Sequence, residues 1–90
     1  MAITKHARAR MQQRNIPPLM IDLLYRYGRE QSQDGATLLY LDERGRAHAR
    51  HALLDVARRF DKLGSTYLVE GSEGGDLLTI GHRCRRIKRK

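Results

Sequence analysis

The sequence contains very little cysteine, proline or aromatic residue. It has one cysteine, two prolines and no tryptophan, and aromatic residues make up 6% of its 90 positions. A single cysteine excludes an internal disulfide and suits a reducing compartment, so the expected location is cytoplasmic. No apolar run approaches the roughly 20 residues of a membrane span, and no signal-peptide pattern opens the chain. No membrane partner is therefore expected.

Acidic residues are missing from both ends of the chain. Residues 1–14 carry a charge of +4 and residues 81–90 a charge of +6, each without Asp or Glu, whereas residues 15–80 carry −2. If the two ends meet in space, they form a localised positive surface on a slightly acidic body. Such a surface favours nucleic-acid phosphates, an acidic protein or an anionic membrane. The alternative is that the ends are solvated basic tails.

Apolar spacing and turn residues predict the order helix, helix, strand, strand, helix, strand, strand. Thr4 is the expected N-cap of a helix from about Lys5 to Arg14, which the Ile16-Pro17-Pro18 stretch must end. The remaining expected elements are a helix from about Pro18 to Gly28, strands near 29–32 and at 37–41 around an Asp34–Gly35 turn, a helix over 47–63, and strands at 66–70 and 76–80. This order predicts one α+β domain over residues 1–90, with helices packed on a small, mainly antiparallel sheet.

A histidine stands beside arginines at each end of the chain. His6, Arg10 and Arg14 are spaced four residues apart, so on a helix they share one face. His82 and Arg83 follow the last expected strand. Arginine suits phosphate oxygens, and histidine titrates near neutral pH, so these residues could cleave RNA without a metal ion. The alternative is a phosphate clamp that performs no chemistry.

Metal and cofactor chemistry finds little support in the sequence. Carboxylates are scattered, and no phosphate-binding Gly-Lys-Thr loop is present. A zinc site built from His48, His51, His82 and Cys84 would lack the paired cysteines of such sites. We therefore expect no metal and no cofactor.

Both end motifs resemble those of one protein family. The stretch "HARARMQQRNI" resembles the His-Ala-x-x-Arg-Met-x-x-Arg-x-Ile opening of a small bacterial domain family of unknown function. The stretch "LLTIGHRCRRIKR" resembles its Thr-Val-Gly-His-Arg-x-Arg-Arg-Ile-Lys-Arg ending. In layout that family is similar to RelE-, ParE- and BrnT-like toxins, which share a compact α+β fold. RelE- and BrnT-like members are RNases that use basic residues and are held inactive by an antitoxin, whereas ParE-like members act on DNA gyrase.

The resemblance implies a RelE-like, metal-independent endoribonuclease toxin. Its expected partners are RNA, with ribosome-associated mRNA as one candidate, and an acidic antitoxin. The residues expected to be catalytic are His6, Arg10, His82 and Arg83. Those expected to bind nucleic acid are Arg14, Arg85, Arg86, Lys88 and Arg89. The alternatives are a non-catalytic nucleic-acid or ribosome-binding module and a ParE-like domain that targets a protein.

Overall fold

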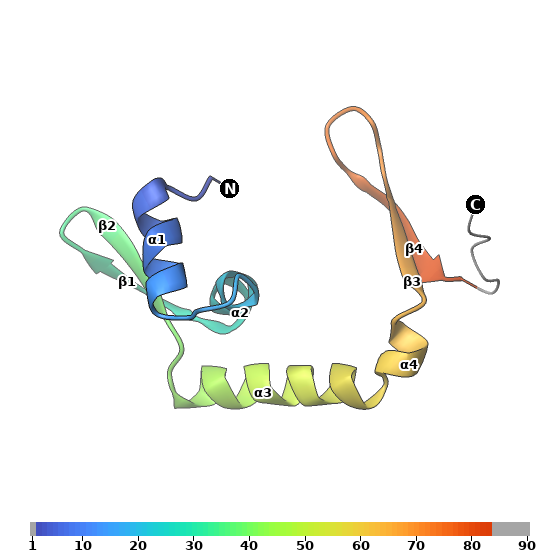
Figure 1. Ribbon diagram of the computed structural model, residues 1–90, viewed down its shortest axis with the longest axis horizontal. Helices are drawn as coiled ribbons and strands as arrows, with labels where there is room; N and C mark the ends of the chain where they lie inside the picture. Colours follow the sequence, from blue (N-terminus) through green and yellow to red (C-terminus); the bar gives the residue numbers. More distant parts are fainter. Residues whose placement is uncertain (1, 84–90) are drawn as a thin grey trace. The chain divides into compact units, whose positions relative to one another are not determined.

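The computed structural model describes residues 2–83, and it has the α+β architecture that the sequence predicts (Figure 1). Helices and strands follow in the order α1, α2, β1, β2, α3, α4, β3, β4. The chain forms two compact units, and the boundary between them falls at His51 and Ala52, inside α3. The α+β class is confirmed, while the assignment of residues 1–90 to a single domain stays a prediction.

The two N-terminal helices begin and end where local signals place them. In α1 (Lys5–Gln13) the Thr4 hydroxyl accepts the Ala7 backbone N–H at 3.1 Å, which confirms the N-cap. Helix α2 (Leu19–Tyr27) ends at Gly28, whose backbone N–H donates to the Leu24 carbonyl at 2.9 Å. The double proline between these helices prevents α1 from continuing.

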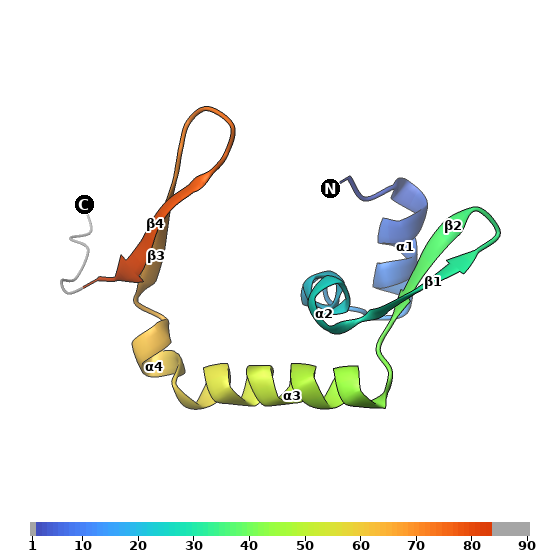
Figure 2. The same ribbon diagram turned by 180° about the vertical axis from the view of Figure 1, so that it is seen from behind.

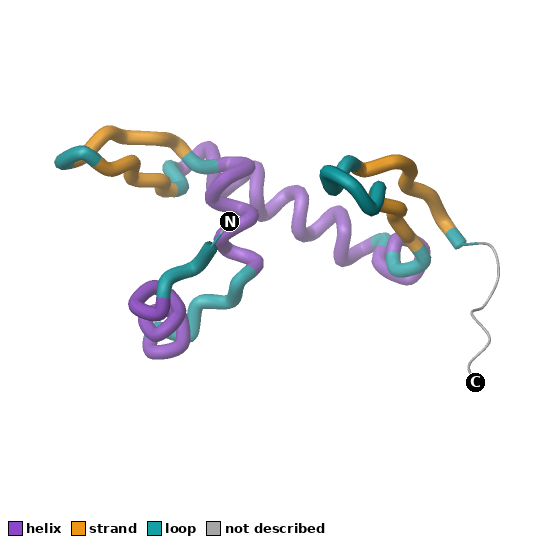
Figure 3. Tube along the Cα trace, turned by 90° about the horizontal axis from the view of Figure 1, so that it is seen from above, coloured by secondary structure: helices purple, strands orange, loops and turns teal. Residues whose placement is uncertain are grey.

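The first hairpin closes on the Asp34–Gly35 turn. Strands β1 (Arg29–Gln33) and β2 (Ala36–Tyr40) are antiparallel, and the pairing of Gln33 with Ala36 leaves a two-residue loop. Both loop residues have positive φ, 47° for Asp34 and 77° for Gly35, as a type I′ turn requires. Figure 3 shows this turn joining the two strands. The predicted turn is confirmed.

The small core of the first unit lies around α2. Leu23 of α2 is only 9% exposed, and α2 contacts β2. In α3 (Glu43–Arg58), Ala49 is 4% exposed and Gly45 is also buried. A Cβ atom on Gly45 would lie 2.6 Å from the Tyr27 carbonyl oxygen, so the start of α3 approaches the end of α2 at backbone distance.

Asp42 precedes α3, caps its first turn and links it to the first hairpin. Its carboxylate accepts the Gly45 backbone N–H at 2.7 Å, which is an N-cap interaction. Arg29 in β1 forms an ion pair with the same carboxylate, with an Nη1–Oδ2 distance of 3.5 Å. The Gly45 hydrogen bond first, and Arg29 after it, hold the pKa of Asp42 below its ordinary value.

We expect this cap to weaken in acid. Because folding lowers the pKa of Asp42, its stabilising contribution is present above the ordinary value of 3.8 and is lost as the pH falls through the folded value. The melting temperature of Asp42→Asn should therefore fall less steeply below about pH 4 than that of the native protein. Thermal unfolding followed by circular dichroism between pH 2.5 and about 6 measures this difference. Equal slopes would show that the ionised cap does not stabilise the fold.

The expected helix over 47–63 is corrected at both ends. Helix α3 starts four residues earlier, at Glu43, because Asp42 supplies a cap, and it stops at Arg58. Arg59 is not helical, with φ −109° and ψ 16°, and a separate short helix, α4 (Phe60–Leu63), follows it. The Arg59 N–H is shared between the carbonyls of Asp55 and Val56, which is the tightening typical of a helix end. Apolar periodicity continues through the break and so could not reveal it.

A second antiparallel hairpin completes the described chain. Strands β3 (Thr66–Glu70) and β4 (Leu77–His82) are antiparallel, and Figure 2 shows the loop that joins them. This loop is rich in glycine. Strand β3 matches the prediction, whereas β4 extends two residues past the expected end and includes His82. The strands of residues 2–83 thus form two separate two-stranded sheets. No helix in this part of the chain is long and apolar enough to cross a membrane.

Candidate functional site

The predicted catalytic residues fall into two clusters, one in each unit. His6 and Arg10 lie in α1, in the first unit, and His82 and Arg83 lie at the end of the second hairpin. That the two clusters share one site stays a prediction, because it concerns the placement of one unit against the other. Four residues predicted to bind nucleic acid lie outside the described residues, namely Arg85, Arg86, Lys88 and Arg89, and so does Cys84.

The first cluster is an exposed basic stripe on α1. His6 and Arg10 are one helical turn apart, and Arg14 is the C-cap residue of the same helix. All three are exposed, and within residues 2–83 none of them forms an ion pair with a carboxylate. The stripe can therefore contact phosphates, but in the described part of the chain no hydrogen bond or ion pair orients His6 for proton transfer.

In the second cluster, by contrast, a neighbour holds the histidine. His82 is the last residue of β4 and pairs with Thr66. Ser65 precedes Thr66, and its Oγ lies 3.2 Å from Nδ1 of His82. The Ser65 carbonyl accepts the Arg83 backbone N–H at 2.9 Å, which continues the hairpin ladder beyond His82. The imidazole is thus hydrogen-bonded to Ser65 through Nδ1. Nε2 has no protein partner among the described residues.

A cavity of about 360 Å³ opens beside this imidazole. Its lining residues come from the end of α3, from α4 and from the hairpin, and they are Arg59, Lys62, Leu63, Ser65 and His82. All of them belong to the second unit. Most of the lining surface is apolar, and Arg59 and Lys62 are the lining residues whose side chains are of the kind that binds phosphate.

The two cations of the cavity are not equally available. The Arg59 guanidinium donates to the Asp55 carboxylate in a bidentate pair, with distances of 3.1 Å from Nε and 2.7 Å from Nη2. This hydrogen-bonded pair raises the pKa of Arg59 and lowers that of Asp55. Lys62 makes no ion pair in the described part of the chain. Lys62 is therefore the cation best able to contact an entering anion.

Sequence reasoning missed Ser65, Lys62 and Arg59. Ser65 carries no motif signal, because a serine after a helix-ending glycine is an ordinary loop residue. Its relevance arises from the strand pairing, which brings it opposite Arg83, next to His82. Gly81 precedes His82 in the same strand. A Cβ at Gly81 would lie 3.4 Å from the ring of Tyr67, so a tyrosine of this same hairpin covers that position.

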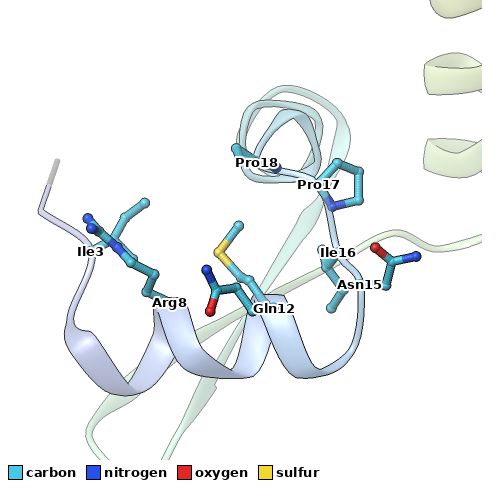
Figure 4. Close-up of a pocket in the computed structure, with 8 residues that line it drawn as sticks. Ile3, Arg8, Gln12, Asn15, Ile16, Pro17 and Pro18 are labelled. Carbon is cyan, nitrogen blue, oxygen red and sulfur yellow. The ribbon is translucent and has the colours of Figure 1, made fainter.

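Helix α1 also borders an open apolar groove, shown in Figure 4. The groove measures about 720 Å³ and is lined by Ile3, Arg8, Met11, Gln12, Asn15, Ile16, Pro17 and Pro18. At 100° per residue, Arg8, Met11 and Gln12 lie on the side of α1 opposite His6 and Arg10. The groove and the basic stripe are therefore separate surfaces of one helix.

Neither metal ligands nor similarity to known proteins indicates the function of these clusters. Within residues 2–83, no group of three or more His, Cys, Asp or Glu side chains could hold a metal ion. Comparison of the chain with protein-family models, curated proteins and solved structures gave no match. The likeness to RelE-like toxins accordingly stays a prediction that rests on the two end motifs.

Proposed function

We propose that this chain is a cytoplasmic, RelE-like RNA-binding domain that cleaves RNA without a metal ion. One observation carries the proposal. His82 is held through Nδ1 by Ser65 on the wall of a cavity that Lys62 also lines. An oriented imidazole with a free nitrogen, next to a cation that can bind a phosphate, is the minimum needed for proton transfer at a phosphodiester.

The proposed reaction uses the RNA's own 2′-hydroxyl as nucleophile. An imidazole nitrogen takes the hydroxyl proton, the 2′-oxygen forms a bond to the adjacent phosphorus, and the bond from phosphorus to the 5′-oxygen breaks. The departing oxygen takes a proton from a second acid or from water. The products are a 2′,3′-cyclic phosphate and a free 5′-hydroxyl. Lys62 and Arg83 are proposed to stabilise the charge that builds on the phosphoryl oxygens.

The remaining basic residues are proposed to hold the RNA. His6 and Arg10 are proposed to join the reaction from α1, and Arg14 to contact a flanking phosphate. The expected binding residues beyond the described chain are Arg85, Arg86, Lys88 and Arg89. Each phosphate contact on a single strand should add about 0.7 to the negative log–log salt slope of binding. An acidic antitoxin is proposed as the partner that blocks this basic surface.

Purified protein should cut mixed-sequence RNA in the presence of excess chelator. The expected products carry a cyclic phosphate or the 3′-phosphate formed when it opens. An RNA with a single 2′-deoxy nucleotide at the cleavage position should bind equally well and stay intact, because the nucleophile is missing. Gel analysis of end-labelled RNA and mass spectrometry of the product ends provide the measurement. Cleavage of the 2′-deoxy substrate at the same position would exclude this mechanism.

Salt-dependent RNA binding without any cleavage would instead identify a non-catalytic nucleic-acid or ribosome-binding module. The basic stripe on α1 would serve that function as it stands, since phosphate contact requires no oriented proton carrier. Folded protein that binds but never cuts RNA would therefore favour this alternative.

A protein target, as for ParE-like domains, is favoured by a different observation, the groove of Figure 4. Its walls are apolar at Met11 and Ile16, its charged lining residue is Arg8, and α1 contains no acidic residue. These features suit an amphipathic helix that places apolar side chains in the groove and a carboxylate against Arg8. Binding of an acidic helical peptide that is lost in Met11→Glu, with no affinity for RNA, would support this second function.

A further inference from the structure

Ser65 has one hydroxyl proton and two hydrogen-bonding neighbours. Its Oγ lies 2.8 Å from the Lys62 carbonyl oxygen and 3.2 Å from Nδ1 of His82. A carbonyl oxygen only accepts, so the shorter contact requires that the serine donates its proton to Lys62. No second proton remains for the imidazole.

The contact with His82 must therefore run in the opposite direction. A serine oxygen that has donated its proton still offers lone pairs, so Nδ1 of His82 has to be the donor. A neutral imidazole that carries its proton on Nδ1 has its lone pair on Nε2. The hydrogen-bond direction at Ser65 thus determines which nitrogen of His82 can take up a proton.

We propose that Ser65 is a positioning residue that fixes the Nδ1–H tautomer of His82 and presents Nε2 to the cavity as a general base. This inference rests on the proposed function for the chemistry, because it assigns His82 to the first step. Nε2 accepts the 2′-hydroxyl proton, and the imidazolium that results is bonded to Ser65 through Nδ1–H. The proton on Nε2 is given up to water after the 5′-oxygen has left, which restores the starting tautomer.

In the part of the chain that the structure describes, the surroundings offer no other hydrogen-bonding partner that could select the tautomer. The basic residues that line the cavity with His82 are Lys62 and Arg59, and within residues 2–83 the one carboxylate paired with either of them is Asp55, which Arg59 binds. Among the described residues no carboxylate contacts the imidazole. The hydroxyl of Ser65 is consequently the group that selects the tautomer.

Nitrogen NMR of the native chain tests the inference directly. Two-bond and three-bond couplings from the ring carbon protons distinguish Nδ1–H from Nε2–H, and His82→Gln identifies the signals of this histidine among the four. At a pH where His82 is neutral, we expect the native protein to show mainly Nδ1–H. In Ser65→Ala the ratio of Nδ1–H to Nε2–H should fall by about 2- to 12-fold, which is the equilibrium value of one neutral hydrogen bond. Ser65→Thr, which keeps the hydroxyl, should restore it.

Measurements of RNA cleavage then distinguish failure of this inference from failure of the proposed function. Ser65→Ala should lower kcat by a similar factor with little change in KM, because it shifts the base without removing a phosphate contact. A native protein that cuts RNA while His82 is mainly Nε2–H would overturn the role of Ser65 and leave the proposed function intact. A native protein with the Nδ1–H tautomer and no RNA cleavage would confirm the positioning by Ser65 and refute its catalytic use.

Discussion

Replacement of His82 by alanine should lower the rate of RNA cleavage by about 10²- to 10⁴-fold while RNA affinity stays nearly unchanged. This range is typical for the loss of a general acid or base. Affinity should persist because the phosphate contacts come mainly from the arginine and lysine side chains, which this substitution leaves in place. Single-turnover cleavage at saturating protein and a separate binding titration with 2′-deoxy substrate measure the two quantities.

Two variants make the comparison specific. His51→Ala removes an exposed histidine of α3 that has no proposed role, so its cleavage rate should match that of the native protein. Lys62→Gln, unlike His82→Ala, should weaken RNA affinity. It should also reduce the negative log–log salt slope of binding by about 0.7, because one phosphate contact is lost. If cleavage survived the loss of both His6 and His82, the proton carriers would be other residues and the assignment made from the two histidines would be wrong.

Replacement of Gly45 by alanine should destabilise the first unit by about 1 to 3 kcal/mol, the usual cost of forcing extra volume into packed structure. Helix propensity alone predicts the opposite sign, since alanine is favoured over glycine inside a helix by about 0.8 to 1 kcal/mol. The close approach should prevail because a Cβ atom would lie 2.6 Å from the Tyr27 carbonyl oxygen, and a backbone atom at the end of α2 cannot rotate away. Urea unfolding followed by circular dichroism gives the free energy.

Gly71→Ala is the matched control for this prediction. Its nearest neighbour would lie 3.7 Å from the new Cβ, an ordinary contact, so its effect should stay within about 0.5 kcal/mol. A Gly45→Ala protein more stable than the native one would show that helix propensity outweighs the contact. The start of α3 would then not lie against Tyr27 in solution.

Several elements of the fold could be predicted because their causes are local. Thr4 caps α1 with its own hydroxyl, and the Asp34–Gly35 turn needs only two residues that tolerate positive φ. Gly28 likewise ends α2 at the residue where it was expected to do so. Each of these depends on interactions within a few residues, so the identity of the residues is sufficient information.

The bounds of the third predicted helix were wrong because apolar spacing does not reveal where a helix starts or breaks. Its apolar positions repeat with helical spacing through Phe60 and Leu63, and this pattern says nothing of the non-helical backbone at Arg59. Its true start depends on Asp42, whose carboxylate is shared between Gly45 and Arg29 of a distant strand. The cap itself is a local polar interaction between Asp42 and Gly45, and a pattern of apolar residues does not register it.

The sequence by itself determined the α+β class, the basic ends and the residue types available for chemistry at His6 and His82. Only the tertiary structure decided which neighbours those residues have. Antiparallel pairing of β3 with β4 brings Ser65 to His82 across 17 positions of chain, and the end of α4 adds Lys62 to the same cavity. A hydrogen bond between side chains so far apart in the chain depends on strand register, and register is a property of the folded pair rather than of either strand alone.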